Sequence, residues 1–300
     1  MSQLNLCWDG VMEQPGKPER GQRPERRCAV LGCPIGHSLS PVLHRAAYAE
    51  LGLNWRYDAY EVDESRLAGF LGELGPEWRG LSLTMPLKRV VIPLCDEVSD
   101  LARRVGAVNT LILDDGRRVG SNTDVPGMVA ALKERGIDAV RTALLLGVGA
   151  TACSALAALA ELGAQTVHAL ARDPARAAEL RALSERLQVA TTVVPWVDVA
   201  TIPRVDLVVS TVPENAAGAV AKQVVDRASI VFDAIYEPWP TRLASSAMAA
   251  GRAVVSGLDL LVHQAALQVE LMTGRQPAPI AAMRSAGERA LASRVAAGPG

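Results

Sequence analysis

The sequence contains few aromatic residues: Phe, Trp and Tyr together make up 4% of its 300 residues. Proteins that bind single-stranded nucleic acid stack the bases on such side chains, so this class is not expected. The charge is balanced, since 31 Lys and Arg residues against 32 Asp and Glu residues give a net charge of −1. Such a chain has no general attraction for nucleic acid or for an anionic membrane, and neither is expected as a partner.

Cysteine and histidine are scarce as well. The five cysteines are widely spread without a C-x-x-C pair, and the four histidines form no H-x-x-x-H pattern. These spacings predict no zinc site, and no metal is expected. Reduced thiols are the simplest interpretation of this cysteine usage, which favours a cytoplasmic protein.

The first 27 residues differ in composition from the rest of the chain. They contain three prolines among many charges, end in ERGQRPERR, and lack the apolar core of a signal peptide. We expect a disordered tail over residues 1–27. A basic patch that recruits a partner is the less favoured alternative.

Short apolar strands alternate with helical segments through the remaining sequence. This alternation predicts an α/β fold with a largely parallel sheet covered on both faces. We expect two domains with a ligand cleft between them: an N-terminal α/β substrate domain (28–123 plus 258–300) and a doubly wound, Rossmann-like domain (124–257). The expected strands include 28–32, 55–62, 142–146, 166–170, 191–194, 205–210, 229–233 and 253–255. The expected helices include 41–51 with Ser40 as its cap, 65–74, 97–105, 126–135, 150–162, 174–187 and most of 258–293.

The stretch RGLSLTMPLKRVV, residues 79–91, places a lysine where a strand turns into a helix. Its apolar part is typical of a buried strand, and Pro86 suits the first turn of a helix. Lys88 then lies near a helix N-terminus, where the macrodipole disfavours a cation. A solvated lysine is the simple interpretation of this stretch alone, and a catalytic role is the alternative that would explain the position.

The apolar run 143–160 is long enough for a membrane helix, but two glycines divide it into a short strand and a helix. The division creates the pattern G-x-G-x-x-A between strand and helix. The glycines permit a tight turn and close approach to a pyrophosphate, and the helix N-terminus supplies free N–H groups. Dinucleotide binding is favoured over an ordinary Gly-rich turn. The residues expected to contact the cofactor here are Gly147, Gly149, Ala150, Thr151 and Ala152.

The next strand leads into ARDPAR, residues 171–176. Arg172 and Arg176 can bracket the 2′-phosphate of NADP, although two solvated arginines at a helix start fit the same pattern. Asp173 leaves two alternatives open. It can cap the helix that starts at Pro174, or it can accept a ribose hydroxyl and favour NAD.

Several stretches together resemble the shikimate dehydrogenase family, which includes shikimate/quinate dehydrogenases. The resemblance covers about residues 28–290. In chain order it rests on GCPIGHSLSP, LSLTMPLK, GAVNTL, NTDVPG, GVGATA, ARDPAR, DAIYEPWPT and HQAALQVELMTG. It implies an oxidoreductase that reversibly reduces 3-dehydroshikimate to shikimate with NADPH, in the route to chorismate and the aromatic amino acids. It leaves open a monomer or a homodimer.

The resemblance also implies a role for individual residues. It implies that Lys88 and Asp124 are the catalytic pair, and our hypothesis is that Lys88 exchanges a proton with the C3 oxygen while Asp124 orients the lysine. The implied contacts to the substrate carboxylate are Ser38, Ser40 and Tyr236, and those to the ring hydroxyls are Thr84, Asn109 and Gln264. The implied cofactor contacts are Arg172 and Arg176 at the 2′-phosphate, and Thr211, Val212 and Gly257 near the nicotinamide. We assign the histidines no role, since none has a carboxylate or second ligand at a suitable spacing.

Two stretches depart from the family pattern. Ser82 and Leu83 occupy the positions of the usual Asn-Val before the Thr-x-Pro segment, which leaves the packing beneath Lys88 open. The segment from 210 to 213 reads Ser-Thr-Val-Pro instead of Asn-Ala-Thr-Pro, which weakens the individual nicotinamide contacts. The alternatives to be separated are a quinate or aminoshikimate dehydrogenase that uses NAD, a non-catalytic NADP-binding regulator, and a folate-linked dehydrogenase.

Overall fold

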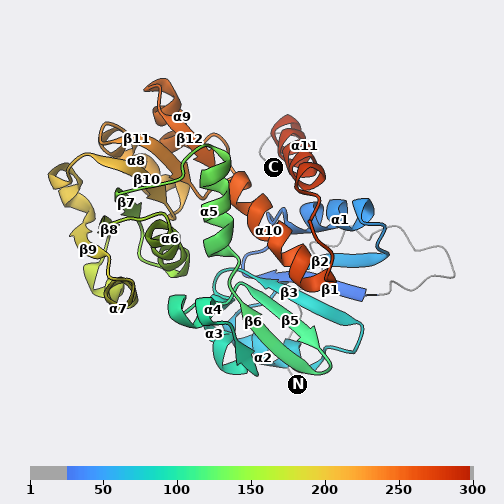
Figure 1. The fold of residues 1–300 in the computed structure, drawn as a ribbon. Coiled ribbons are helices and arrows are strands. Elements are labelled where there is room, and N and C mark those ends of the chain that lie inside the picture. Colours follow the sequence, from blue (N-terminus) through green and yellow to red (C-terminus); the bar gives the residue numbers. More distant parts are fainter. Residues whose placement is uncertain (1–25, 298–300) are drawn as a thin grey trace, which may run out of the picture.

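The computed structural model describes residues 26–297. The predicted tail therefore lies outside the described residues, except that Arg26 and Arg27 begin the first strand. No helix in the described part is long and apolar enough to cross a membrane. Two six-stranded sheets, each with helices packed on it, form the two-domain α/β fold that the sequence predicts (Figure 1).

The first sheet has the strand order β2-β1-β3-β5-β6-β4 and is mixed. Strand β1 pairs in parallel with β2 and β3, whereas β5 is antiparallel to both β3 and β6. The strands are β1 (Arg26–Gly32), β2 (Trp55–Glu61), β3 (Trp78–Leu83), β4 (Glu97–Val98), β5 (Thr110–Asp114) and β6 (Arg117–Ser121). The helices of this part are α1 (Ser40–Glu50), α2 (Glu64–Gly72), α3 (Leu87–Val90) and α4 (Asp100–Val105), with a 3-10 turn at Ile92–Leu94.

Both faces of the first sheet are covered because successive side chains of a strand point to opposite faces. Cys28 and Val30 of β1 belong to a core shared with α1 and the C-terminal helices. Ala29 and Leu31 belong to a second core on the other face, with residues of α2 and α3. Because both faces of β1 are buried, its side chains form a continuous apolar run in the sequence.

The second sheet is wholly parallel, with the order β12-β11-β10-β7-β8-β9. Numbered within this sheet, the order is 3-2-1-4-5-6, which is that of a Rossmann domain with its switch point between β7 and β10. The strands are β7 (Thr142–Leu146), β8 (Thr166–Ala171), β9 (Ala190–Pro195), β10 (Val205–Ser210), β11 (Ala228–Asp233) and β12 (Ala253–Ser256). The helices are α6 (Ala150–Glu161), α7 (Ala178–Leu187), α8 (Glu214–Val225) and α9 (Arg242–Ala249), with 3-10 turns at Pro174–Ala177 and Trp196–Thr201.

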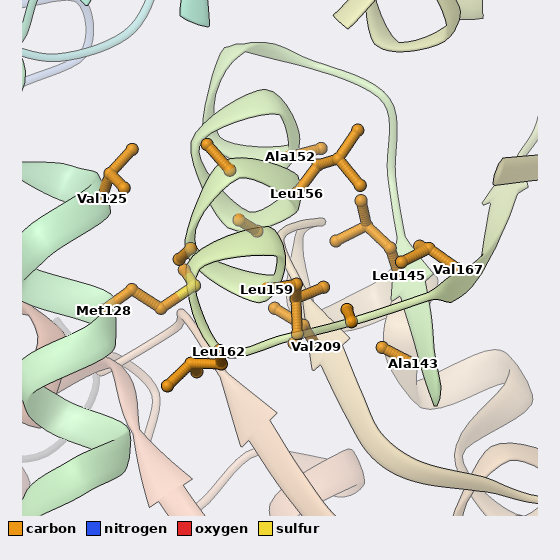
Figure 2. Close-up of a cluster of buried hydrophobic side chains, with 14 of the residues drawn as sticks. Val125, Met128, Ala143, Leu145, Ala152, Leu156, Leu159, Leu162, Val167 and Val209 are labelled. Atoms are coloured by element: carbon orange, nitrogen blue, oxygen red, sulfur yellow. The ribbon is translucent and has the colours of Figure 1, made fainter. Parts of the chain in front are cut away.

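Helix α6 lies between this sheet and helix α5 (Asp124–Glu134). Figure 2 shows Leu156 and Leu159 of α6 among side chains of the strands, with Met128 of α5 on the other side. The helix is rich in alanine, so neighbouring elements can approach it closely on several sides. The start of α6 is thereby fixed relative to both the sheet and α5.

Helices α5 and α10 (Gly257–Thr273) lie side by side between the two sheets (Figure 1). Their approach is close: a Cβ atom on Gly127 would lie 2.9 Å from the backbone nitrogen of Gln264. The last helix, α11 (Ile280–Ala297), packs on α1 and α10. This arrangement brings the start of α5 and the middle of α10 to the same place.

Charged side chains connect the end of α5 with the start of α10 and with α11. Asp259 of α10 accepts hydrogen bonds from Arg135 and Arg284. Burial raises the pKa of Asp259, but hydrogen bonds from Ser256 and the two arginines outweigh it, and the net pKa is lowered. His263 Nε2 lies 3.0 Å from Glu134 Oε2. Helix packing creates this pair between residues that are 129 positions apart, so the sequence spacing on which the histidines were assessed does not reveal it.

Most predicted elements agree with the structure in type, and the differences lie at the predicted helix starts, where residues 97–98 form a strand and residues 174–177 a 3-10 turn. Ser40 is the first residue of α1 and no cap, because Leu39 before it is already in the right-handed helical region, where a capping geometry cannot form. Helix α5 begins at Asp124 instead of 126, since the Asn122 side chain accepts a hydrogen bond from the Val125 N–H. The predicted helix 97–105 is a short strand followed by α4, which Ser99 caps.

Candidate active site

Lys88 and Asp124 form an ion pair in which Lys88 Nζ lies 2.6 Å from Asp124 Oδ2. The lysine side chain is 12% exposed and the aspartate side chain 2%. Lys88 lies in the single-turn helix α3, and its carbonyl accepts a hydrogen bond from the Val108 N–H. The structure thus brings together the two residues predicted to be catalytic, from α3 and from the start of α5.

Asn109 holds the other oxygen of Asp124. Its Nδ2 group donates to Asp124 Oδ1 at 2.9 Å and to Gln264 Oε1 at 3.0 Å. Its Oδ1 atom accepts from the Thr123 N–H at 2.8 Å and from the Thr110 hydroxyl at 2.9 Å. Asn109 is buried, so its orientation is set at both ends of the amide. Asp124 is consequently fixed before any ligand arrives.

Gln264 reaches this network from α10. Its Oε1 atom accepts from Asn109, and within the described residues no hydrogen bond uses its Nε2 group. The side chain is half-buried. Its N–H donors are therefore available to a ligand next to Lys88 and Asp124.

The residues predicted to hold a carboxylate lie around the start of α1. Ser38 Oγ accepts a hydrogen bond from the Ser40 N–H at 3.3 Å. Burial raises the pKa of Tyr236, and the backbone of Leu39 beside its hydroxyl lowers it in part. Tyr236 therefore lies next to the segment that carries both serines. Their three hydroxyls are suited to a carboxylate as hydrogen-bond donors.

Thr84 follows β3, and its backbone N–H bonds to the Leu31 carbonyl. Its methyl group lies over Gly32: a Cβ atom on that glycine would be 2.4 Å from Thr84 Cγ2. Any larger residue at position 32 would displace Thr84. The glycine of the GCPIGHSLSP segment thus makes room for a predicted substrate contact.

A buried polar chain beneath the site was not predicted. Tyr57 donates to Ser82 Oγ at 2.6 Å, and Ser82 donates to Gln268 Oε1 at 2.7 Å. Gln268 in turn donates to Thr110 Oγ1 at 3.1 Å. Ser82 therefore forms hydrogen bonds on both sides, which answers the question raised by its departure from the family pattern. Gln268 follows Gln264 by four residues, and this shared helix face was the available signal.

The Gly-rich turn after β7 lies close against the residues that follow β10. Gly147 has φ +108°, and a Cβ atom there would lie 2.7 Å from Thr211 Oγ1 and 2.9 Å from Val212 Cγ1. Gly149 faces open space. In the described chain no side chain caps the start of α6. The first N–H groups of α6, on Ala150, Thr151 and Ala152, are therefore free to bind an anion.

The segment after β8 carries two exposed arginines. Within the described residues, no ion pair or side-chain hydrogen bond engages Arg172 or Arg176. Asp173 accepts a hydrogen bond from the Ala175 N–H at 3.0 Å, which confirms the capping alternative. The guanidinium groups are free while the carboxylate is engaged. This combination fits the 2′-phosphate of NADP better than the ribose diol of NAD.

Gly257 begins α10 directly after β12. A Cβ atom there would lie 2.3 Å from the carbonyl oxygen of Ala234. The glycine is explained by this close packing alone. The predicted contact of Gly257 with a nicotinamide stays a prediction.

Comparisons with known proteins agree with this geometry. Residues 30–111 match the family model of the shikimate dehydrogenase substrate binding domain, and residues 257–286 match that of the shikimate 5′-dehydrogenase C-terminal domain. The chain is 39% identical over 280 residues to "Shikimate dehydrogenase (NADP(+))" of Oleidesulfovibrio alaskensis, covering 90% of this chain and 97% of the relative.

Solved structures give the same result. The shikimate dehydrogenase of Mycobacterium tuberculosis has a TM-score of 0.80 at 41% identity, covering 88% of this chain and 99% of that one. The shikimate 5-dehydrogenase of Thermus thermophilus, solved with NADP(H) and shikimate, has a TM-score of 0.75 at 34% identity, covering 89% and 100%. The chain therefore belongs to the shikimate dehydrogenase family.

Proposed function

We propose that this protein is an NADP-dependent shikimate dehydrogenase, which reversibly reduces 3-dehydroshikimate to shikimate in the route to chorismate and the aromatic amino acids. The observation that carries the proposal is the buried Lys88–Asp124 pair, 2.6 Å apart, with Asn109 on the second carboxylate oxygen. A module that only binds NADP has no need of such a pair. The relatives named above carry the same activity in their names.

The cofactor is held by the second sheet. The N–H groups at the start of α6 bind the pyrophosphate, and Arg172 and Arg176 bind the 2′-phosphate. Thr211, Val212 and Gly257 lie toward the nicotinamide. When bound, NADPH supplies the hydride for the carbonyl carbon of the substrate.

The proton is supplied by Lys88. In the direction of reduction, Lys88 Nζ donates a proton to the C3 oxygen as negative charge develops there. In the direction of oxidation, the same nitrogen takes the proton from the C3 hydroxyl. Asp124 holds the ammonium group in place throughout, and Asn109 holds Asp124 through its second oxygen.

The substrate is oriented by two groups of residues. Ser38, Ser40 and Tyr236 donate hydrogen bonds to the carboxylate. Thr84, Asn109 and Gln264 contact the ring hydroxyls, with the free Nε2 group of Gln264 as a donor. These contacts place the C3 oxygen against Lys88, which converts the proton transfer into a step between fixed partners.

Each of the two sheets belongs to a different proposed domain. We assign residues 28–123 and 258–300 to the substrate and catalytic domain, and 124–257 to the NADP domain. The protein acts in the cytoplasm as a monomer or a homodimer. Light scattering on the purified chain distinguishes these two states.

The test is a set of initial rates with shikimate and with quinate, each with NADP and with NAD. Activity with shikimate and NADP, and little in the other three combinations, is the expected result. Activity with quinate and NAD would instead assign the protein to the quinate-type enzymes and contradict the role of the two arginines. Bound cofactor without activity in any combination would favour a binding module.

A further inference from the structure

Arg89 follows Lys88 in α3 and reaches the NADP domain. Its guanidinium group forms an ion pair with the carboxylate of Glu179 in α7. Its Nη2 atom also lies 3.8 Å from the sulfur of Cys153 in α6. One side chain thus connects the helix of the proposed proton donor with two helices of the other domain.

Helix α6 carries proposed cofactor contacts at its start, and α7 directly follows the 3-10 turn that contains Arg176. Glu179 lies in the first turn of α7, three residues after Arg176. Cys153 directly follows the last residue of the G-x-G-x-x-A turn. Arg89 therefore meets the NADP domain beside the proposed sites of the 2′-phosphate and of the pyrophosphate.

Helix α3 depends on contacts outside itself for its position. It has four residues, and a helix of one turn gains little stability from its own hydrogen bonds. Leu87 anchors it in the core of the first domain, and the Val108 N–H holds the Lys88 carbonyl. Toward the NADP domain it is held by the Lys88–Asp124 pair and by the contacts of Arg89 with Glu179 and Cys153. A neighbouring bond between the domains runs from the Arg186 guanidinium to the Arg104 carbonyl at 3.0 Å.

We propose that Arg89 is a positioning residue whose ion pair with Glu179 sets the helix of Lys88 in place relative to the NADP domain. The reaction needs this alignment, because the proton comes from one domain and the hydride from a cofactor held by the other. The inference rests on the proposed function for its kinetic consequence. The contact itself does not depend on that function.

The expected effect is moderate because the pair is partly exposed. The Arg89 side chain is 38% exposed and that of Glu179 59%. Exposed pairs are weak and are screened by salt. We therefore expect a loss of about three- to fivefold in kcat when the pair is broken, with the largest effect at low ionic strength.

The kinetic test uses the variants Arg89→Ala and Glu179→Gln. Each is expected to lower kcat with little change in the KM for shikimate. The double variant should lose no more than either single variant, and the exchanged pair R89E/E179R should recover most of the loss. The control is Arg117→Ala, since Arg117 pairs with Glu97 wholly within the first domain and both side chains are more than half exposed.

Salt gives a readout that a merely structural role would not move. Raising the salt concentration from about 0.05 M to about 0.5 M should lower kcat of the unmodified enzyme toward that of Arg89→Ala, because screening weakens the pair. The rate of the variant should change less. An unchanged kcat in Arg89→Ala, or losses that add in the double variant, would overturn the proposal.

Hydrogen–deuterium exchange without substrate separates this proposal from the proposed function. Peptides that contain α3 should exchange faster in Arg89→Ala than in the unmodified protein or in Arg117→Ala. If the unmodified protein fails to oxidise shikimate with NADP but shows this difference, the proposed function is wrong and the role of the pair stands. Equal exchange in an active enzyme would show that the pair does not hold α3.

Discussion

Lys88 Nζ lies 2.6 Å from Asp124 Oδ2, and Asn109 Nδ2 lies 2.9 Å from the other oxygen of the same carboxylate. Asp124 is thus bonded on both oxygens and 2% exposed. A buried carboxylate needs such partners, since an uncompensated buried charge is costly. The arrangement holds the ammonium group of Lys88 in one direction and leaves its remaining N–H groups for a ligand.

Replacing Lys88 with alanine is expected to lower kcat by about three orders of magnitude, because it removes the proton donor. The KM for shikimate should change less than about threefold, since the substrate contacts remain. Steady-state rates with NADP measure both quantities. The variant will also lose stability because Asp124 loses its counter-ion, so circular dichroism must confirm that it is folded at the assay temperature.

The variants Asp124→Asn and K88A/D124N complete this prediction. The aspartate acts through the lysine, so its removal should add little once Lys88 is gone. A double variant whose loss equals the product of the two single losses would contradict the proposed division of roles. Near-normal turnover in Lys88→Ala would contradict the mechanism itself.

Asn109→Ala is expected to lower both stability and turnover. The change leaves Asp124 Oδ1 without its donor and the Thr123 N–H without its acceptor, at a cost of about 2–3 kcal/mol in the free energy of unfolding. We expect kcat to fall at least about tenfold because Asp124 is no longer held. Urea unfolding and steady-state kinetics measure the two effects.

A matched control for Asn109 is Thr241→Ala. Thr241 is equally buried, donates to Asp233 Oδ2 at 2.7 Å and caps α9, and it is not among the proposed substrate or cofactor contacts. Its loss should reduce stability by about 1–2 kcal/mol and leave kcat unchanged. If Asn109→Ala resembles this control, Asn109 is only a structural residue.

Arg172 and Arg176 are expected to determine the choice of cofactor. In R172A/R176A the KM for NADP should rise by about one to two orders of magnitude, because two charge-assisted contacts to the 2′-phosphate are lost. The KM for NAD should change little. Asp173→Asn is the control, since Asp173 is engaged as a cap. A selective loss of NAD activity in that control would show that Asp173 binds the ribose.

The Rossmann sheet could be predicted because each of its strands and its Gly-rich turn can be recognised within a short stretch of sequence. Strands such as β7 and β10 are short apolar runs between helices, and the G-x-G-x-x-A turn marks the point where β7 meets α6. The fold then follows from the general rules for parallel strands joined by helices. For Lys88 the unfavourable position is visible in a stretch of about a dozen residues, but that stretch alone favours a solvated lysine, and the catalytic role follows from the resemblance to the family.

The contacts around the site could not be predicted in this way. Gln268 reaches Ser82 from the far end of the chain, and Glu179 reaches Arg89 from another domain. Such pairs depend on how two helices or two domains pack. The start of α5 was predicted two residues too late for a related reason. The Asn122 side chain accepts a hydrogen bond from the Val125 N–H, while Asp124 pairs with Lys88 and Asn109 from other parts of the chain.

His44 is expected to make stability depend on pH below neutrality. The ring is fully buried and stacked on Tyr57 with 3.8 Å between ring centres. Its Nδ1 donates to the Ser40 carbonyl at 2.9 Å, while Nε2 has no partner within the described chain. Burial lowers the pKa of His44 to about 4, although the Ser40 carbonyl opposes this.

The direction in which stability changes with pH follows from this lowered pKa. The unfolded chain takes up the proton near pH 6.5, whereas the folded protein does so only near pH 4. The contribution of His44 is therefore complete above about pH 6.5 and is lost as the pH falls toward 4. At pH 5 the loss amounts to about 2 kcal/mol in the free energy of unfolding.

Urea unfolding at pH 7.5, about 6 and about 5 measures this loss. The carboxylates whose pKa is lowered, such as Asp259 and Asp206, titrate below this range. His44→Asn should be less stable at pH 7.5, because it leaves a cavity, but it should lose less on acidification since its amide does not titrate. His37→Asn, at an exposed position, is the control and should keep the original pH dependence. A His44→Asn variant that loses as much stability between pH 7.5 and 5 as the unmodified protein would show that another group causes the acid sensitivity.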